Sequence, residues 1–335
     1  MTRTSRHGSA PATMACLALC AAGCVADSAS AQSGPGAWPV KPIRMVVAFS
    51  PGGTSDTLSR ILGQKITEAF GQPVIVDSRP GASGMIGAEI AARAAPDGYT
   101  LMHAYIGQFS VNPSLFVKLP YDPLRDFTPV SLVATAPQIV VVNPDLPVKS
   151  VKDLIDLARE KPGQLNFGSG GSGTLSFVGG ELFQTLTGVK MVHVSYKGTV
   201  LAQNDLLGGR VQVMFSDMPT ALPQARVGKL RAIAVTSIKR SSLLPALPTL
   251  AESGVPGYEL TAWWGVVGPR GIPSEIVARL HAELARMHAL ADIRDRYEAL
   301  GVEPMTNTPA QFAAFIREDS ARFAKLLKAA GVKAD

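Results

Sequence analysis

Residues 43–56 read Ile43-Arg44-Met45-Val46-Val47-Ala48-Phe49-Ser50-Pro51-Gly52-Gly53-Thr54-Ser55-Asp56, and this stretch indicates the fold. Its first half is an apolar run, typical of a strand that is buried on both faces. The serine, proline and two glycines that follow predict a turn. Apolar residues then recur at positions 58, 61, 62 and 66, so the turn opens a helix. We therefore expect the first unit of an α/β sheet.

Strands and helices alternate along the rest of the chain. Residues 73–77 and 99–104 are predicted strands, and residues 85–94 form the helix between them. This β-α-β-α-β order is typical of a parallel sheet with helices on its faces. Later strands are predicted at residues 138–142, 165–167, 191–194, 211–215, 230–235 and 264–267. One later helix is predicted to begin at Ser150, and another is predicted to end at Leu186. Further helices are predicted at residues 201–207, 274–290 and 309–330.

The alternation predicts two α/β sheets, the second inserted within the first, and hence two lobes. The chain is expected to cross between them near residues 135 and 255, and a double crossing provides a hinge. The predicted first lobe comprises residues 38–135 and 256–335, and the second comprises residues 136–255.

Two glycine-rich loops share one design, in which a strand is followed by a small turn and the start of a helix. The first contains Gly53, Thr54, Ser55 and Asp56, and the second is Gly168-Ser169-Gly170-Gly171-Ser172-Gly173-Thr174. Helix starts carry partial positive charge and unpaired N–H groups, so they bind carboxylates or phosphates without a lysine. Two such loops facing each other across a hinge would form an anion clamp. Either loop alone is equally well read as a tight turn with a hydroxyl cap.

Catalytic, nucleotide and metal sites find less support. Residues 168–173 fit the G-x-G-x-x-G pattern, but no acidic residue ends the next strand, as a dinucleotide site requires. Neither Ser83 nor Ser172 lies in a G-x-S-x-G elbow. The histidines lack metal-ligand spacing, and His103 and His193 are interpreted as core or strand-end residues. We therefore expect no catalytic residue, metal or cofactor.

Two acidic residues and a tryptophan pair can each be interpreted in two ways. Asp56 either contacts an amine or hydroxyl of a ligand or caps the helix that it opens. Asp217 ends a strand and is either a ligand contact or a solvated loop acid. Trp263-Trp264 is expected at a lobe junction, where one ring could line the cleft.

The N-terminus predicts export from the cytoplasm. Two arginines precede an apolar run, and Ala29-Ser30-Ala31 provides the small residues of a cleavage site, so residues 1–31 are read as a signal peptide. All three cysteines lie in this segment; the alternative is a lipoprotein anchored through Cys24. Cleavage removes two arginines and one aspartate, which changes the net charge from +6 to +5. The basic residues are scattered, which argues against nucleic-acid binding.

Several motifs together resemble the Bug-type receptors, the periplasmic binding subunits of tripartite tricarboxylate transporters. The resemblance runs from about residue 38 to the C-terminus. Its motifs are Pro51-Gly52-Gly53-x-x-Asp56, Asp77-Ser78-Arg79-Pro80-Gly81-Ala82-Ser83-Gly84, Ala94-Ala95-Pro96-Asp97-Gly98-Tyr99-Thr100, Tyr121-Asp122-Pro123-Leu124-Arg125-Asp126-Phe127, Tyr196-Lys197-Gly198 and Leu247-Pro248-Thr249-Leu250-Ala251-Glu252-Ser253-Gly254.

The resemblance implies a two-lobed type II periplasmic-binding-protein fold, α/β with mixed sheets, that binds a small carboxylate in a cleft between the lobes. It also implies a periplasmic location, membrane transporter subunits as partners and, in our expectation, a monomer. The expected ligand-binding residues are Gly53, Thr54, Ser55, Asp56, Ser83, Gly84, Gln108, Ser169, Gly171, Ser172, Gly173, Thr174, Tyr196, Lys197, Gly198 and Asp217.

Two departures from the family pattern affect these expectations. Asp77-Ser78 replaces an acidic residue followed by asparagine, and residues 103–108 replace a small, hydroxyl-rich stretch. The identity of the ligand therefore stays open among dicarboxylates, amino acids and aromatic carboxylates. The alternative functions are an exported α/β hydrolase acting on carboxylated compounds and a receptor that signals to a membrane partner.

Overall fold

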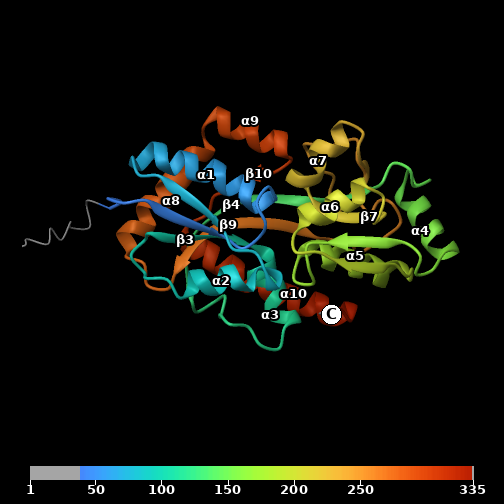
Figure 1. Ribbon diagram of the computed structural model, residues 1–335, viewed down its shortest axis with the longest axis horizontal. Helices are drawn as coiled ribbons and strands as arrows, with labels where there is room; N and C mark the ends of the chain where they lie inside the picture. Colours follow the sequence, from blue (N-terminus) through green and yellow to red (C-terminus); the bar gives the residue numbers. More distant parts are fainter. Residues whose placement is uncertain (1–37, 334–335) are drawn as a thin grey trace, which may run out of the picture.

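The computed structural model describes residues 38–333, which form an elongated molecule (Figure 1). The predicted signal peptide of residues 1–31 and Cys24 lie outside these residues. Within residues 38–333, no helix has both the length and the apolar character needed to cross a membrane.

One end of the molecule is the β-α-β-α-β unit that the sequence predicts. β1 (Ile43–Val47) lies between β2 (Val74–Ser78) and β3 (Thr100–Tyr105) and pairs in parallel with both. α1 (Thr54–Phe70) and α2 (Met85–Ala92) connect these strands. Three short helical elements complete this end: η2 (Ala82–Gly84), η3 (Gly107–Val111) and α3 (Asn112–Leu115).

The long strand β4 (Phe127–Val142) joins the two ends of the molecule in one sheet. Its first part pairs antiparallel with β9 (Thr261–Pro269), and its last residues pair with β7 (Val213–Asp217) and β8 (Arg231–Val235). The two sheets expected from the sequence are thus continuous. The other strands are β5 (Asn166–Ser169), β6 (Val192–Ser195) and β10 (Glu303–Pro304).

The mixed sheet of ten strands has the order β2-β1-β3-β9-β4-β7-β5-β6, with β8 and β10 paired to β4. The sequence predicted only residues 138–142 of β4, because Pro129 and Pro137 interrupt the preceding residues. Proline cannot donate to a strand ladder and is tolerated mainly at bulges or edges. The pairing of β4 with β9 shifts register between Pro129 and Ser131, and this irregularity accommodates the first proline.

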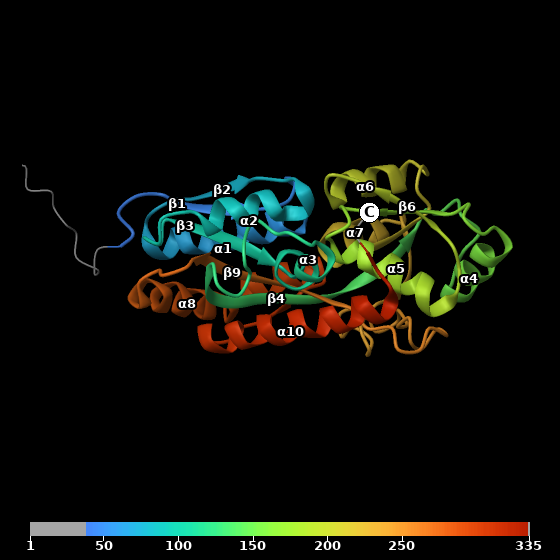
Figure 2. The ribbon, with the colours of Figure 1, turned by 90° about the horizontal axis from the view of Figure 1, so that it is seen from below.

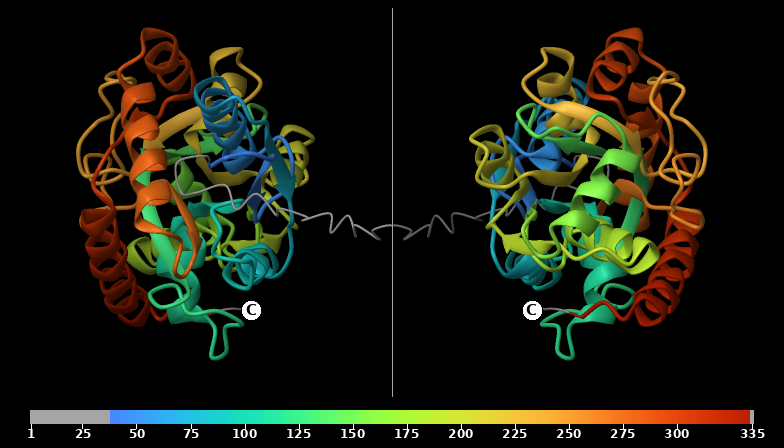
Figure 3. Two further views of the ribbon diagram at one scale, coloured as in Figure 1. Left: turned by 90° about the vertical axis from the view of Figure 1, so that its left-hand side faces the viewer. Right: turned by 90° about the vertical axis from the view of Figure 1, so that its right-hand side faces the viewer.

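Helices cover the sheet at both ends. The second end carries α4 (Val151–Glu160), α5 (Leu175–Thr187), α6 (Thr199–Leu207) and α7 (Met218–Arg226). The C-terminal region forms α8 (Ser274–His288), α9 (Ala291–Leu300) and α10 (Pro309–Ala330). The view along the molecule shows the C-terminal helices, in orange and red, on the side opposite the blue N-terminal elements (Figure 3).

The last helix runs along both ends of the molecule. Figure 2 shows α10 beneath β4, reaching from the α8 end to α5. At its far end the Oγ1 of Thr185 donates a hydrogen bond of 3.1 Å to the carbonyl of Ala330. The helix therefore packs against segments that the sequence assigned to different lobes.

The tryptophan pair of β9 packs in the core behind the site. Trp263 and Trp264 are both nearly fully buried. The Nε1 of Trp263 donates to Asp319 on α10 at 2.8 Å, and Trp264 stacks on Tyr105 with a ring-centre distance of 5.7 Å. The pair lies on β9 beside β4, neither ring lines the site described next, and Trp264 supports a residue that does.

Candidate functional site

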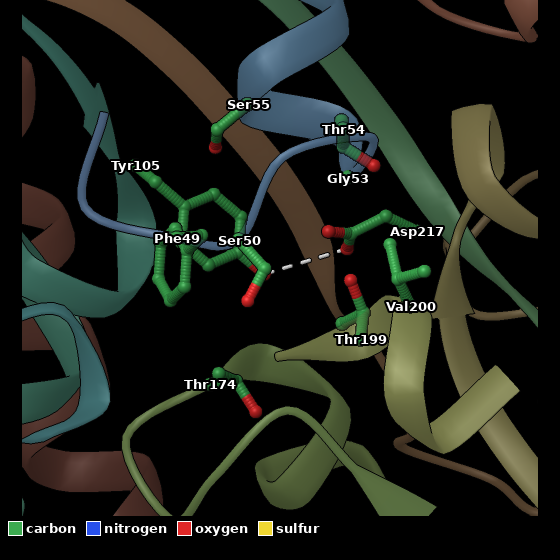
Figure 4. Close-up of a pocket in the computed structure, with 10 residues that line it drawn as sticks. All are labelled: Phe49, Ser50, Gly53, Thr54, Ser55, Tyr105, Thr174, Thr199, Val200 and Asp217. Carbon is green, nitrogen blue, oxygen red and sulfur yellow. Dashed lines mark hydrogen bonds between the residues drawn. The ribbon is translucent and has the colours of Figure 1, made fainter. Parts of the chain in front are cut away.

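A small cavity lies where four helices begin, at the carboxyl ends of β1, β5, β6 and β7 (Figure 4). In open α/β sheets this edge is where ligands bind. We call it the inner cavity. Its ten lining residues are Phe49, Ser50, Gly53, Thr54, Ser55, Tyr105, Thr174, Thr199, Val200 and Asp217.

The first loop contributes the start of α1. Gly52 has a φ of 77°, a left-handed conformation that favours glycine, and Gly53 is the extended N-cap residue. This turn brings Gly53, Thr54 and Ser55 to the cavity. Glycine has no side chain that could accept hydrogen bonds at the N-cap. The N-cap residue therefore leaves the first N–H groups of α1 without a side-chain acceptor.

Asp56 does not line the inner cavity; it holds the first loop in shape. Its carboxylate accepts a hydrogen bond of 3.0 Å from the Gly52 N–H and two from Arg60, at 2.9 and 3.0 Å. Burial alone would raise the pKa of Asp56, but the bonds from Arg60 and Gly52 outweigh it and lower the pKa. Asp56 is thus an ionised carboxylate whose hydrogen bonds come from its own loop and helix and, at 3.5 Å, from the Ser78 hydroxyl at the end of β2.

The second glycine loop contributes only Thr174 to the inner cavity. Thr174 is the N-cap residue of α5, and its Oγ1 donates to the Gly171 carbonyl at 2.6 Å. Ser169 is buried, and its Oγ lies 2.6 Å from the Nε2 of His193, so it faces the protein interior.

The starts of α6 and α7 complete the inner cavity. Gly198, with a φ of 134°, is the N-cap residue of α6, and the cavity is lined by the next two residues, Thr199 and Val200. Sequence reasoning missed both. A glycine directly before a helix is the same signal as in the first loop and could have identified Thr199. Asp217 is the N-cap residue of α7.

An aromatic pair and an acid form the remaining wall. Phe49 and Tyr105 pack edge to face with ring centres 5.4 Å apart. Asp217 is only 5% exposed, so its interpretation as a solvated loop acid is wrong. Its Oδ1 accepts hydrogen bonds from Gln138 Nε2 at 3.3 Å and from Tyr105 OH at 3.4 Å. Burial raises the pKa of Asp217 to about 6, and these two bonds limit the rise.

The two ends of the molecule touch around the inner cavity. Thr54 Oγ1 lies 2.8 Å from Thr220 Oγ1. The Oγ of Ser50 donates to the Lys197 carbonyl at 2.8 Å, and the Gly173 N–H donates to Ser83 Oγ at 3.1 Å. The cavity volume is about 20 Å³, room for about one water molecule. The contacts between the two ends therefore enclose a small cavity.

A larger groove of about 520 Å³ lies on the other side of Phe49. We call it the outer groove. It contains six of the predicted binding residues: Ser83, Gly84, Gly171, Ser172, Tyr196 and Lys197. The Tyr196 hydroxyl donates to Asp205 at 2.7 Å and so has a partner within its own end of the molecule.

Five predicted binding residues line neither the inner cavity nor the outer groove: Asp56, Gln108, Ser169, Gly173 and Gly198. Gln108 is fully buried in η3, and neither of its amide atoms has a hydrogen-bond partner among the described residues. A Cβ on Gly84 would lie 2.4 Å from Gln108 Nε2. Gln108 therefore supports the Ser83-Gly84 turn from behind.

The chain matches one protein family and several solved structures. The family described as "Tripartite tricarboxylate transporter family receptor" (TctC) matches residues 58–332. The structure of Rpa4515 from R. palustris with adipate is 38% identical, with a TM-score of 0.86, and the match covers 88% of this chain and 99% of that one.

Two further structures agree over similar lengths. The periplasmic binding protein BugD is 34% identical, with a TM-score of 0.85, over 89% of this chain and 100% of that one. MatC from Rhodopseudomonas palustris with bound malate is 32% identical, with a TM-score of 0.83, over 87% of this chain and 100% of that one. The expected α/β periplasmic-binding-protein fold is confirmed.

Proposed function

The chain belongs to the family of tripartite tricarboxylate transporter receptors, and from this premise we propose that it binds one small carboxylate in the inner cavity and delivers it to the membrane subunits of a transporter. The observation that carries the proposal is the meeting of four helix starts at one cavity. Adipate and malate, which the relatives Rpa4515 and MatC hold, are both small carboxylates.

The chemistry of the inner cavity suits a carboxylate. Each helix start contributes roughly 0.3–1 kcal/mol toward a nearby anion. Hydroxyl groups of Ser50, Ser55, Thr174 and Thr199 surround the same space, and no lysine or arginine is among the lining residues. A carboxylate held by neutral donors and helix starts needs no cationic partner.

Binding is coupled to closure in this proposal. The moving units are residues 38–135 with 256–335, and residues 136–255, and β4 and β9 lie at their junction. Ligand enters when the units separate and is enclosed by the contacts around Thr54 and Ser83. The protein works as a periplasmic, monomeric binding protein without catalytic activity. The outer groove, with Ser83, Gly84, Gly171, Ser172, Tyr196 and Lys197, takes the distal part of longer ligands.

Gly53→Ala tests the inner cavity directly. The backbone of Gly53 has a φ of −79°, which alanine adopts. Its Cβ would lie 3.4 Å from the Ser50 carbonyl oxygen, 3.7 Å from Thr199 Oγ1 and 3.9 Å from Val200, all ordinary contact distances. The added methyl group therefore occupies the cavity without strain. The matched control is Gly208→Ala, since a Cβ there meets only backbone oxygens of its own helix.

The measurement is thermal unfolding with a panel of dicarboxylates, amino acids and aromatic carboxylates, after native mass spectrometry of the purified protein. A bound ligand at a hundredfold excess over Kd stabilises the protein by about 2.7 kcal/mol. We expect this stabilisation in the unmodified protein and in Gly208→Ala, and its loss in Gly53→Ala. If no carboxylate stabilises the unmodified protein, the proposed function is wrong.

A further inference from the structure

An acid in a cavity that attracts anions is unexpected. Asp217 lines the inner cavity, and none of the other nine lining residues carries a charged side chain. A carboxylate ligand would therefore meet a buried carboxylate without an intervening cation. Unpaired like charges in a site of low polarity are strongly unfavourable.

The carboxylate of Asp217 lines the inner cavity and does not cap its own helix. An aspartate at an N-cap normally accepts a hydrogen bond from the second or third N–H of the helix. The side chain of Asp217 makes no such bond to α7, and Pro219, in the first turn, has no N–H to donate. Figure 4 shows the carboxylate of Asp217 directed into the space between Tyr105, Thr199 and Thr54.

The two oxygens of Asp217 have different roles. Among residues 38–333, the two side chains that donate hydrogen bonds to this carboxylate, through Gln138 Nε2 and Tyr105 OH, both reach Oδ1. Oδ2 is thereby left as an acceptor at the cavity. Tyr105 is the titratable group that contacts Asp217; burial raises the pKa of its phenol, so it stays protonated and donates. Gln138 is neutral, so the groups around Asp217 at neutral pH are donors without charge.

We propose that Asp217 selects carboxylates that carry a hydrogen-bond donor, a hydroxyl or an ammonium group, beside the carboxylate bound at the helix starts. This inference rests on the proposed function. Because the inner cavity is small, a carboxylate bound at the helix starts would have Oδ2 next to it or to the carbon that bears it. A hydrogen-bond donor of the ligand at this position satisfies Oδ2, whereas a CH₂ group leaves a buried carboxylate oxygen unpaired. Sites that are built to accept such a bond discriminate strongly against analogues that lack the donor.

The test compares matched ligands by isothermal titration calorimetry at pH 7.5. The sets are succinate, malate and aspartate; glutarate, 2-hydroxyglutarate and glutamate; and phenylacetate, mandelate and phenylglycine. Within a set that binds, we expect the hydroxyl or the amino compound to bind at least about tenfold more tightly than the plain acid. Comparison of the hydroxyl compound with the amino compound of the same set shows which of the two donors the site prefers.

Asp217→Asn makes the test specific to this side chain. Gln138 and Tyr105 donate to Oδ1, so the asparagine amide keeps its oxygen at that position and presents its NH₂ group where Oδ2 was. An acceptor at the cavity becomes a donor, and the preference is expected to shift toward the plain acid. Asp156→Asn, on the exposed face of α4, is the control and keeps the original preference.

Two results would overturn the inference while leaving the proposed function intact. One is binding of the plain acids as tightly as their hydroxyl and amino analogues. The other is an unchanged preference in Asp217→Asn. Absence of binding across all three sets and the wider carboxylate panel would instead overturn the proposed function, and the inference with it.

Discussion

Asp56 and Asp217 both lie at the first turn of a helix, yet their surroundings shift their pKa values in opposite directions. Asp56 accepts hydrogen bonds from a guanidinium and a backbone N–H, which lower its pKa against the effect of burial. Asp217 accepts two longer bonds from neutral donors in the part of the chain that the structure describes, and burial raises its pKa to about 6. At the scale of single residues, hydrogen-bond partners decide which acid holds a loop and which one faces the inner cavity.

Asp217→Asn is expected to change how the stability of the ligand-free protein depends on pH. The pKa of Asp217 is raised from 3.8 in the folded protein, so the folded state binds this proton more tightly than the unfolded state. The protonated form of Asp217 therefore stabilises the folded state below about pH 4. This stabilisation, on the order of 3 kcal/mol, is lost as the pH rises to about 6.

The measurement is urea unfolding of both proteins between pH 4 and 7. The asparagine does not titrate, so the variant does not lose this stability as the pH rises. The free energy of unfolding of Asp217→Asn minus that of the unmodified protein should therefore increase across this range and level off above pH 6. A difference that stays constant with pH would show that Asp217 does not titrate as described.

At the scale of elements, the inner cavity is built from strand-to-helix connections, and glycine permits close approach of the chain at the start of α6. Gly198 has a φ of 134°, and a Cβ there would lie 2.6 Å from the Oγ of Ser50. The same serine donates to the Lys197 carbonyl across the closed cleft. With a side chain at residue 198, Ser50 would have to move, and its bond to the Lys197 carbonyl would be disturbed.

Gly198→Ala is expected to weaken both folding and ligand binding. Gly188→Ala is the control: Gly188 also has a left-handed φ, of 69°, but nothing lies within 4 Å of its Cβ position. The control should lose roughly 1–2 kcal/mol of stability from backbone strain alone. Gly198→Ala should lose more and should raise Kd, because Ser50 and Thr199 must move. Equal losses in the two variants, with an unchanged Kd, would contradict this account.

At the scale of the whole molecule, the closure that we propose depends on the hydrogen bonds that join the two ends, among them those of Thr54 and Ser83. The bond between Thr54 and Thr220 joins the starts of α1 and α7, and it forms only when these helices meet. Because one such bond contributes about 0.5–1.5 kcal/mol, its loss shifts the balance between open and closed forms without unfolding either end.

Thr220→Val keeps the shape of the side chain and removes this bond. We expect Kd to rise by about 2- to 12-fold, which corresponds to 0.5–1.5 kcal/mol, with little change in the stability of the ligand-free protein. Small-angle scattering should show a larger radius of gyration for the variant at subsaturating ligand. Thr187→Val, which removes a hydroxyl bonded within α5, is the control. An unchanged Kd would mean that this contact does not contribute to closure.

The local sequence was sufficient for most elements and for the first glycine loop. Periodic apolar residues predicted α1 and α10, and Ser150 was correctly predicted to cap α4. α7 was missed, because Pro219 and Pro223 lie within its nine residues and proline disfavours a helix interior. Most of β4 was missed for the same reason.

What the sequence determined by itself was the alternation of strands and helices, and with it the family and the two glycine loops. These features depend on neighbouring residues, whose spacing in the chain already defines their geometry. Only the tertiary structure decided that Thr199 and Asp217 line the inner cavity while Asp56 and Ser169 turn away from it. The direction of a side chain depends on partners far away in the chain, such as Gln138 and Tyr105 for Asp217, which come together only when β3, β4 and β7 lie in one sheet.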